Sequence, residues 1–304
     1  MSPRKPLDLF AIAIMVALCV LWGSQPISVK LISADVAPVM QMGLRSAIAA
    51  VVLGALTIGR EGPRAFSDGS LPAGLLVGLL FAAEFLFIAQ GLVLTSASHL
   101  VVFLYSAPIF SALALPIRFP DERLSPLQWA GVAVAFGGIA VSFLGGGSMS
   151  RDMLLGDGLG LLAGLSWGLT TVAIRASKLS EAPAVKTLFY QVAFAGLTLL
   201  GLAMLIGQTD MNLTPNVLLH LSYQTVVITL ISYVVWFWLP RHYLASRLSI
   251  LSFLTPLFGV VFGVAILNEP LEPPFVMGAV LVLLGISLVS GAEFLRDKFA
   301  RRAA

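Results

Sequence analysis

Three ionisable side chains interrupt long apolar stretches of the sequence: Arg45, Glu84 and His99. A charged group inside a lipid bilayer is costly, so such residues usually lie on the path of a substrate or an ion. We expect Glu84 to face a central cavity, paired with Arg45 or with a solute ammonium group, and such a carboxyl is also a candidate proton carrier. A permanent ion pair between the two is the structural alternative. His99 is expected to form hydrogen bonds at a helix start, with a proton relay as the alternative.

Polar and aromatic side chains form a second group of candidates. Trp22 and Gln25 are three residues apart and therefore share a helix face. Inside a bilayer, polar side chains turn toward water or toward a partner in the protein. The residues expected to line a substrate cavity are Trp22, Gln25, Arg45, Glu84, His99, Phe103, Trp167, Tyr190, Gln191, Tyr233 and Ser252. Such an aromatic lining suits a solute with a large apolar side chain. Interfacial anchoring of Trp and Tyr is the simpler alternative for single members.

Two prolines, Pro108 and Pro256, fall in the middle of apolar stretches. Proline removes a backbone hydrogen bond and permits a helix to bend. Because the two stand at equivalent positions of a repeated sequence, we expect hinges that move between two states. A static kink is the alternative.

Other chemistries lack the residues they require. The single cysteine, Cys19, excludes a cysteine cluster for a metal, and neither a metal nor another cofactor is expected. No pair of residues suggests catalysis, so we expect no enzyme activity. The glycines of residues 156–160 resemble a phosphate loop only loosely, because no lysine follows; they indicate close helix packing. No ATPase subunit and no nucleic-acid partner is indicated.

The composition indicates whether these residues belong to a soluble domain or to a membrane protein. Of 304 residues, 58% are hydrophobic and 11% are charged, with a mean hydropathy of +0.97, whereas soluble domains carry about 25% charged residues. A membrane-spanning helix needs about 20 mostly apolar residues. Ten stretches qualify, namely 8–29, 36–59, 71–93, 97–118, 124–144, 155–177, 184–207, 214–238, 246–268 and 272–292. The sequence thus predicts an all-α membrane protein with ten transmembrane helices.

Basic residues predict the orientation of these spans, since Lys and Arg concentrate in cytoplasmic loops. With a cytoplasmic N-terminus, all 18 Lys and Arg fall on cytoplasmic segments except Lys30 and Arg151 outside and Arg45 within a span. We therefore expect a multi-pass protein of a bacterial-type inner membrane, with both termini in the cytoplasm.

The sequence contains an internal repeat. Glu122, Pro126 and Gly131 recur 147 residues later, and Trp22-Gly23 recurs as Trp167-Gly168. Residues 1–146 and 147–304 are therefore predicted to form two five-helix repeats, joined by the glycines at 145–147. Because five is odd, the second repeat must be inverted relative to the first, as in many secondary transporters with a solute site at the repeat interface. Duplication kept only for packing is the alternative.

These motifs resemble those of a known family. Leu21-Trp22-Gly23-Ser24, the proline-containing fourth and ninth spans, the acidic turns at 121–124 and 268–271, and the glycines of spans five and ten are similar to the drug/metabolite transporter superfamily. The order and duplication of the motifs resemble the EamA-type ten-helix carriers, and the overall likeness extends to the YddG-like amino-acid exporters. The resemblance implies movement of a small metabolite, often its export.

The function expected from the residues and the resemblance is secondary transport by alternating access. The substrates expected are small metabolites such as aromatic or other apolar amino acids, moved outward by a monomer or homodimer in the lipid bilayer. Broad drug or metabolite efflux is the first alternative. Exchange of phosphorylated or nucleotide-linked solutes is less favoured, because holding phosphate requires inward basic residues and the spans offer only Arg45.

Overall fold

The computed structural model describes residues 8–62, 64–120, 123–144, 150–243, 248 and 251–303. Within them the chain is helical apart from turns, coil and one isolated antiparallel bridge between Val36 and Met211. The first half contains α1 (Leu9–Leu31), α2 (Pro38–Glu61), α3 (Leu71–Leu94), α4 (Ala97–Leu104), α5 (Ala107–Arg118) and α6 (Pro126–Leu144). The second half contains α7 (Arg151–Arg175), η2 (Lys178–Ser180), α8 (Ala184–Leu205), α9 (Pro215–Ser222), η3 (Tyr223–Ser232), α10 (Tyr233–His242), α12 (Leu254–Leu267) and α13 (Pro273–Ala303).

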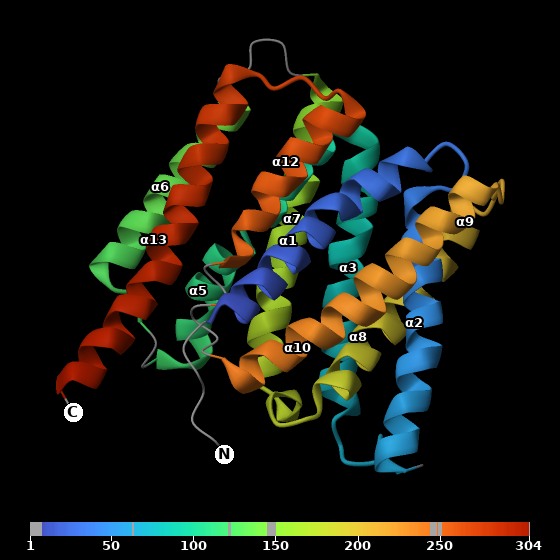
Figure 1. The fold of residues 1–304 in the computed structure, drawn as a ribbon, viewed down its shortest axis with the longest axis horizontal. Coiled ribbons are helices and arrows are strands. Elements are labelled where there is room, and N and C mark those ends of the chain that lie inside the picture. Colours follow the sequence, from blue (N-terminus) through green and yellow to red (C-terminus); the bar gives the residue numbers. More distant parts are fainter. Residues whose placement is uncertain are drawn as a thin grey trace.

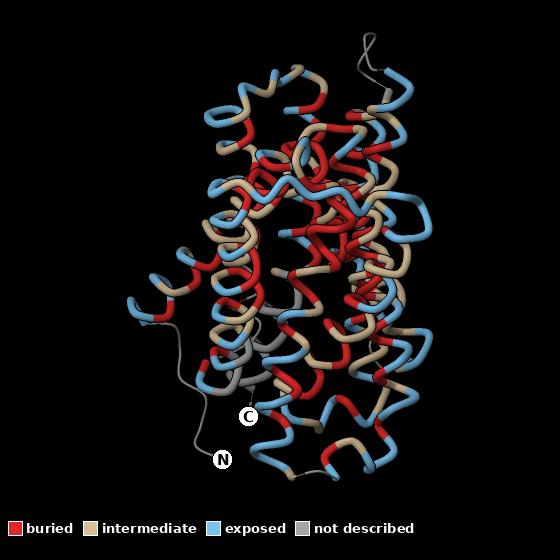
Figure 2. The backbone as a smooth tube through the Cα atoms, turned by 90° about the vertical axis from the view of Figure 1, so that its right-hand side faces the viewer, coloured by how far each residue is buried: buried red, intermediate tan, exposed pale blue. Residues whose placement is uncertain are grey.

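The expected all-α architecture with ten apolar segments is confirmed. In the described part of the chain, eight helices are long and apolar enough to cross a membrane, counting Ala97–Arg118 and Pro215–Trp236 as single segments. Two shorter apolar helices, Leu254–Leu267 and Pro273–Val289, complete the set. Large apolar side chains such as Val51, Leu79 and Leu197 are exposed on the outer faces, and Figure 2 shows buried residues on the inward sides of the helices. Such a surface suits lipid.

Short polar side chains define where several helices begin. Asp8 Oδ1 accepts a hydrogen bond from Ala11 N at 2.8 Å, and the Ser150 hydroxyl accepts one from Met153 N at 3.1 Å. The Ser96 hydroxyl accepts one from His99 N at 3.0 Å and so separates α4 from α3. Each supplies a partner to a backbone N–H that has none inside the helix. The expected division of the third and fourth spans near Thr95-Ser96 is therefore confirmed.

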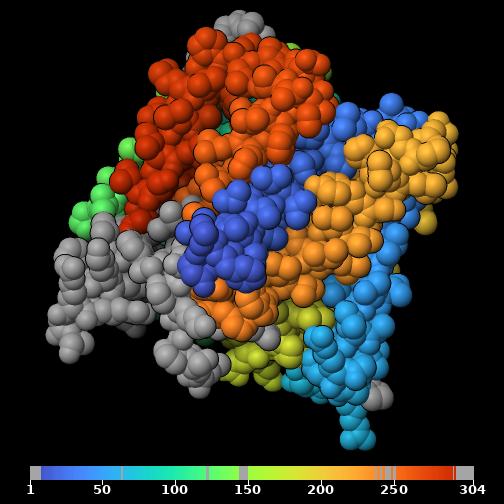
Figure 3. All heavy atoms as spheres, in the orientation of Figure 1, coloured from blue at the N-terminus to red at the C-terminus, as the bar shows by residue number. Residues whose placement is uncertain are grey.

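The two halves of the chain interleave. Helix α2 packs on α8, and α3 packs on both α7 and α8, while α1 packs on α12 and η3. In Figure 3 the N-terminal helix lies on the surface between segments of the second half. Every major interface at the centre thus joins one half to the other, and a movement of one half against the other would alter the centre.

Helices α6 and α13 form a close antiparallel pair at one side of the bundle (Figure 1). A Cβ added at Gly138 would lie 2.6 Å from the carbonyl oxygen of Gly278, and one at Gly131 would lie 2.8 Å from that of Gly285. Only glycine permits this approach, as in other membrane helix pairs with small residues at the contact. The glycines of the fifth and tenth spans therefore set the distance between these two helices.

Both proline-containing spans are interrupted just before the proline. The fourth span breaks at Tyr105 and Ser106, and Pro108 lies in the first turn of α5. In the ninth span a turn at Phe253 precedes α12, which contains Pro256. A further irregularity is η3, a π-helical segment of 10 residues between α9 and α10. Such segments are frequent at functional sites.

Helix α1 begins and α13 ends at the same end of the bundle, the lower end in Figure 1. We call it the terminal end and the opposite one the distal end. At the terminal end, the buried Lys186 of α8 donates to Asp68 Oδ2 at 2.6 Å and to the carbonyl oxygen of Ala65 at 2.5 Å. At the distal end, Asn212 Nδ2 donates to Asp35 Oδ1 at 2.9 Å. Each contact joins a loop of one half to the other half.

Candidate functional site

Arg45 lies at the centre of a buried polar cluster formed by α1, α2 and α3. Its side chain is almost fully buried, with a residue exposure of 1%. When its amide is oriented to satisfy both groups, Gln25 of α1 accepts hydrogen bonds from both terminal nitrogens of Arg45, at 2.7 and 3.2 Å. The guanidinium carbon lies 4.3 Å from the ring centroid of Phe85 in α3, which gives a cation–π contact. The Nε atom of Arg45 has no hydrogen-bond partner.

Glu84 lies in the same region of α3 but forms no ion pair with Arg45. The carboxylate is 7% exposed, and its Oε2 atom is buried without a hydrogen-bond partner. Among the described residues, ion pairs within 4.0 Å do not include Arg45 with Glu84. Tyr233 of α10 is close enough to interact electrostatically with both. The two opposite charges are thus neighbours that retain unused hydrogen-bonding capacity.

This cluster has the chemistry of a site for a zwitterion. Guanidinium binds carboxylate through two parallel hydrogen bonds, and a carboxylate accepts hydrogen bonds from an ammonium group. A buried charge that lacks a paired counter-charge is costly. Binding a solute with both groups would therefore satisfy Arg45 and Glu84 together.

Aromatic side chains from the second half lie beside α1. The indole nitrogen of Trp22 donates to the Ser232 hydroxyl at 2.9 Å, and its ring meets Trp236 edge-on at a centroid distance of 5.4 Å. The hydroxyls of Ser24 and Tyr223 share a hydrogen bond of 2.5 Å. The π-helical segment supplies two of these partners and so connects α1 to α10.

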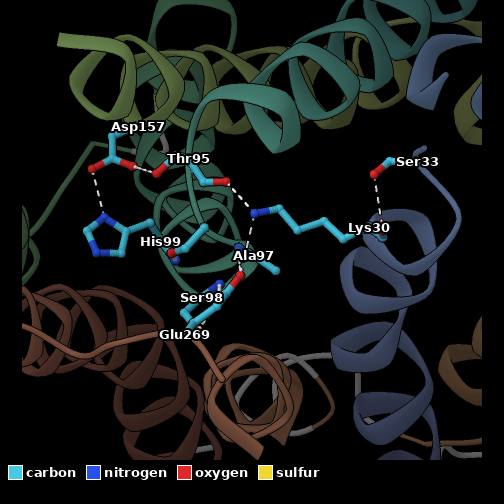
Figure 4. Close-up of polar contacts among 9 residues, drawn as sticks. Lys30, Ser33, Thr95, Ala97, Ser98, His99, Asp157 and Glu269 are labelled. Atoms are coloured by element: carbon cyan, nitrogen blue, oxygen red, sulfur yellow. Dashed lines mark hydrogen bonds and ion pairs between the residues drawn. The ribbon is translucent and has the colours of Figure 1, made fainter. Parts of the chain in front are cut away.

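A second polar network lies at the distal end (Figure 4). His99 Nδ1 is 2.8 Å from Asp157 Oδ2, and the Thr95 hydroxyl donates to Asp157 Oδ1 at 2.5 Å. Lys30 donates to the Thr95 carbonyl oxygen at 2.7 Å and lies 3.5 Å from Glu269 Oε1. These contacts join α1, α4, α7 and the α12–α13 connection.

Other candidates from the sequence contact residues other than Arg45. Phe103 is buried against Phe143, and Trp167 contacts Tyr105 edge-on. The Tyr190 hydroxyl shares a hydrogen bond of 2.9 Å with Ser70 at the terminal end.

The last two lining candidates lie on α8 and directly before α12. Gln191 is buried on α8, and Ser252 is partly buried before α12. Lining by these residues, like hinge motion at Pro108 and Pro256, stays a prediction.

The sequence analysis missed Asp157, Lys30 and Glu269 as site residues. Asp157 is an ionisable residue inside an expected span and could have been a candidate for that reason. It was not chosen because residues 156–160 were interpreted through their glycines. Those glycines do pack closely, since a Cβ at Gly156 would lie 2.7 Å from Thr95. Glu269 belongs to the repeated acidic turn, whose first copy contains Glu122 and lies outside the described residues. In the described residues, no group of three His, Cys, Asp or Glu is arranged to hold a metal ion.

Comparison with known proteins decides the family. The EamA-like transporter family matches residues 9–144 and 154–291, one match in each half. The chain belongs to this family. EamA-like proteins are transporters, so the chain is a multi-pass membrane transporter of a small molecule and not an enzyme.

Individual relatives agree with this assignment. The chain is 29% identical to an uncharacterized transporter of Synechocystis sp., over 91% of this chain and 88% of the relative. It is 27% identical to an Escherichia coli protein named as a probable amino-acid metabolite efflux pump, over 88% and 90%, respectively. The Salmonella typhimurium protein of the same name is 26% identical over the same shares. The chain also matches a protein of known crystal structure, and the match covers 92% of this EamA-like transporter and 97% of that protein. The TM-score of 0.65 at 18% identity shows that the two share a fold.

Proposed function

We propose that this EamA-like transporter is a secondary carrier that exports small amino-acid metabolites with apolar or aromatic side chains by alternating access. Arg45 binds the substrate carboxylate and Glu84 its ammonium group, while Trp22, Phe85 and Tyr233 contact the apolar side chain. The terminal end faces the cytoplasm, as the distribution of basic residues predicts. Two relatives named as probable amino-acid metabolite efflux pumps support the substrate class.

The observation that carries this proposal is the burial of Arg45 without a carboxylate partner. Its exposure is 1%, and its partners among the described residues are an amide oxygen and an aromatic ring. A buried arginine held in this way attracts an anion with a planar pair of acceptors. A single guanidinium beside a carboxylate suits a zwitterion better than a phosphate, which would carry more negative charge than this cluster can neutralise.

Uptake into proteoliposomes tests the proposal. The panel contains amino acids, nucleosides, sugars and a phosphorylated solute, each with and without a pH gradient. We expect apolar and aromatic amino acids to move, and the corresponding amines without a carboxylate to move at least about tenfold more slowly, since a charge-assisted hydrogen bond contributes about 1.5–3 kcal/mol. Movement of the phosphorylated solute alone would overturn the proposal, and equal movement of amines and amino acids would favour broad efflux.

A further inference from the structure

His99 and Asp157 form a buried dyad at the distal end. Their side chains are 2% and 0% exposed, and the Nδ1–Oδ2 distance is 2.8 Å. The carboxylate accepts one further hydrogen bond, from the Thr95 hydroxyl. The imidazole ring stacks on Phe275 of α13 at a centroid distance of 3.7 Å and an interplanar angle of 10°. The ring is thus fixed in position by both its edge and its face.

The dyad leaves one basic atom of the histidine without a partner. With Asp157 ionised, the hydrogen of neutral His99 lies on Nδ1, where the carboxylate accepts it, so Nε2 carries a free lone pair. Nε2 is buried and has no hydrogen-bond partner. A carboxylate that orients imidazole in this way also stabilises the imidazolium formed when Nε2 takes a proton.

Thr95 connects this dyad to a set of contacts between α1, α4 and the α12–α13 connection. Its carbonyl oxygen accepts a hydrogen bond from Lys30, which pairs with Glu269. Glu269 accepts hydrogen bonds from Ala97 N at 2.7 Å, from Ser98 N at 2.9 Å and from the Ser98 hydroxyl at 2.7 Å. The α12–α13 connection is thereby attached to the first turn of α4, the helix that carries His99 (Figure 4). We call the contacts of Lys30 and Glu269 with residues 95–98 the distal latch.

The formal charges of Lys30, Glu269, Asp157 and His99 sum to zero when the dyad carries a proton. Lys30 is positive, whereas Glu269 and Asp157 are negative, so the network has one excess negative charge while His99 is neutral. Glu272, one turn before Phe275, is the titratable residue at the start of α13, and α12 carries none. An uncompensated buried charge is costly, and admission of water relieves that cost. Protonation of Nε2 removes the excess charge without any movement.

We propose that His99 and Asp157 form a proton-binding site that controls the distal latch. A hydronium ion entering from the distal side transfers a proton to Nε2: its O–H bond breaks, an N–H bond forms, and a water molecule is left. The neutral imidazolium–carboxylate pair then holds the latch closed. Return of the proton to water leaves the excess negative charge and opens the latch. A cavity of about 490 Å³, with Lys30, Leu92 and Glu269 in its walls, gives water access to the latch. This inference does not depend on the identity of the substrate.

The test measures how accessible a cysteine becomes at the latch as the pH changes. Cys19 is replaced by Ala, and Leu92→Cys, at a position 3% exposed, reports opening toward the cavity. Leu213→Cys, at a 55% exposed position between α8 and α9 that does not line this cavity, corrects for the intrinsic effect of pH on thiol reactivity. The readout is the rate at which a membrane-impermeant maleimide labels the Leu92→Cys protein, divided by its labelling rate for the Leu213→Cys protein.

We expect this ratio to rise by roughly fivefold or more between about pH 5 and pH 9, because loss of the proton opens the latch. His99→Gln and Asp157→Asn should each make the ratio independent of pH. The matched control His242→Gln, at an exposed histidine of the terminal end, should keep the wild-type pH dependence.

A labelling ratio that does not change with pH in the protein with an intact dyad would overturn the proposal, even if both dyad variants failed to fold. An unchanged pH response in a folded His99→Gln protein would overturn it as well. Because no solute is transported in this assay, either outcome is separate from a failure of the proposed amino-acid export.

Discussion

At the residue scale, the proposed substrate site depends on how Arg45 is held. An arginine inside a bilayer is costly and normally has a carboxylate partner or access to water. In the described residues Arg45 instead has Gln25, which supplies one oxygen, and Phe85, which supplies a ring face. These contacts orient the guanidinium without neutralising it. The proposal that Arg45 binds an anion depends on this arrangement.

Substitutions of Arg45 should distinguish the effect of its positive charge on substrate binding from the effect of its planar shape. Arg45→Gln should reduce the apparent affinity for an amino acid by about 10- to 100-fold, because charge-assisted hydrogen bonds contribute about 1.5–3 kcal/mol. Arg45→Lys should recover only part of this, since ammonium lacks the planar fork. The measurement is concentration-dependent uptake of an amino acid and of its amine analogue. An equal loss for both solutes would show that Arg45 acts through structure and not through the carboxylate.

Asp68 is a second residue with a specific consequence. Hydrogen bonds from Lys186 and then from Ser70 hold the pKa of this carboxyl, in the α2–α3 loop, well below its usual range. A lowered pKa in the folded state means that the contribution to stability is complete above the unfolded pKa of about 3.9 and is lost as the pH falls below it. Asp68→Asn should lower the melting temperature at neutral pH. Thermal unfolding in detergent should show this difference shrinking in acid, and a difference that persists there would exclude the ionised carboxylate as its cause.

At the element scale, the pairing of α6 with α13 depends on glycine. Gly138 and Gly278 approach through backbone atoms, so a side chain on either has no space that a rotamer change could provide. The repeat and the family resemblance singled out the glycines of spans five and ten, but did not assign them a packing role. Which glycines face the partner helix depends on the rotation of each helix and appears only in the structure.

Two neighbouring glycines of α6 provide a matched comparison. Gly138→Ala would place a Cβ 2.6 Å from the Gly278 carbonyl oxygen, whereas Gly137→Ala would meet no atom within 4 Å. Overpacking typically costs about 1–3 kcal/mol. We expect Gly138→Ala to lower the melting temperature by several degrees and Gly137→Ala to leave it unchanged or slightly raised. Equal melting temperatures for the two variants would contradict the proposed close contact.

A second prediction at the element scale concerns the proline-containing spans. If the breaks before Pro108 and Pro256 act as hinges, Pro108→Ala and Pro256→Ala should slow transport while substrate binding stays near the wild-type level. Binding in detergent and transport in proteoliposomes would be measured at matched protein content. Unchanged transport in both variants would indicate static kinks.

At the scale of the whole molecule, the sequence predicted the architecture and only part of the site. Hydropathy and the repeat predicted ten segments closely, as with 71–93 against Leu71–Leu94. The repeat included Glu269 in its acidic turn, but the contacts of Glu269 require α4 to lie beside a loop that follows it by about 170 residues. Tyr190 was grouped with its neighbour Gln191 by position, whereas its side chain turns toward Ser70. Contacts of this kind depend on tertiary packing, which helical periodicity in one sequence does not specify.

The interleaving of the two halves supports a carrier rather than a channel. Central interfaces join one half to the other, and contacts near the terminal and distal ends attach loops across the halves. Two related half-structures supply two related conformations, each open to one side. A solute bound at Arg45 would then face the two sides of the membrane in turn.

Trans-stimulation tests this central claim most directly. Proteoliposomes are loaded with an unlabelled apolar amino acid, and uptake of the labelled amino acid is compared with that of empty vesicles and of vesicles with Arg45→Gln protein. The binding site of a carrier returns across the membrane faster when a substrate occupies it. We therefore expect several-fold faster uptake into the loaded wild-type vesicles and no such gain for Arg45→Gln. Equal initial rates into loaded and empty wild-type vesicles would contradict alternating access to a carboxylate site at Arg45.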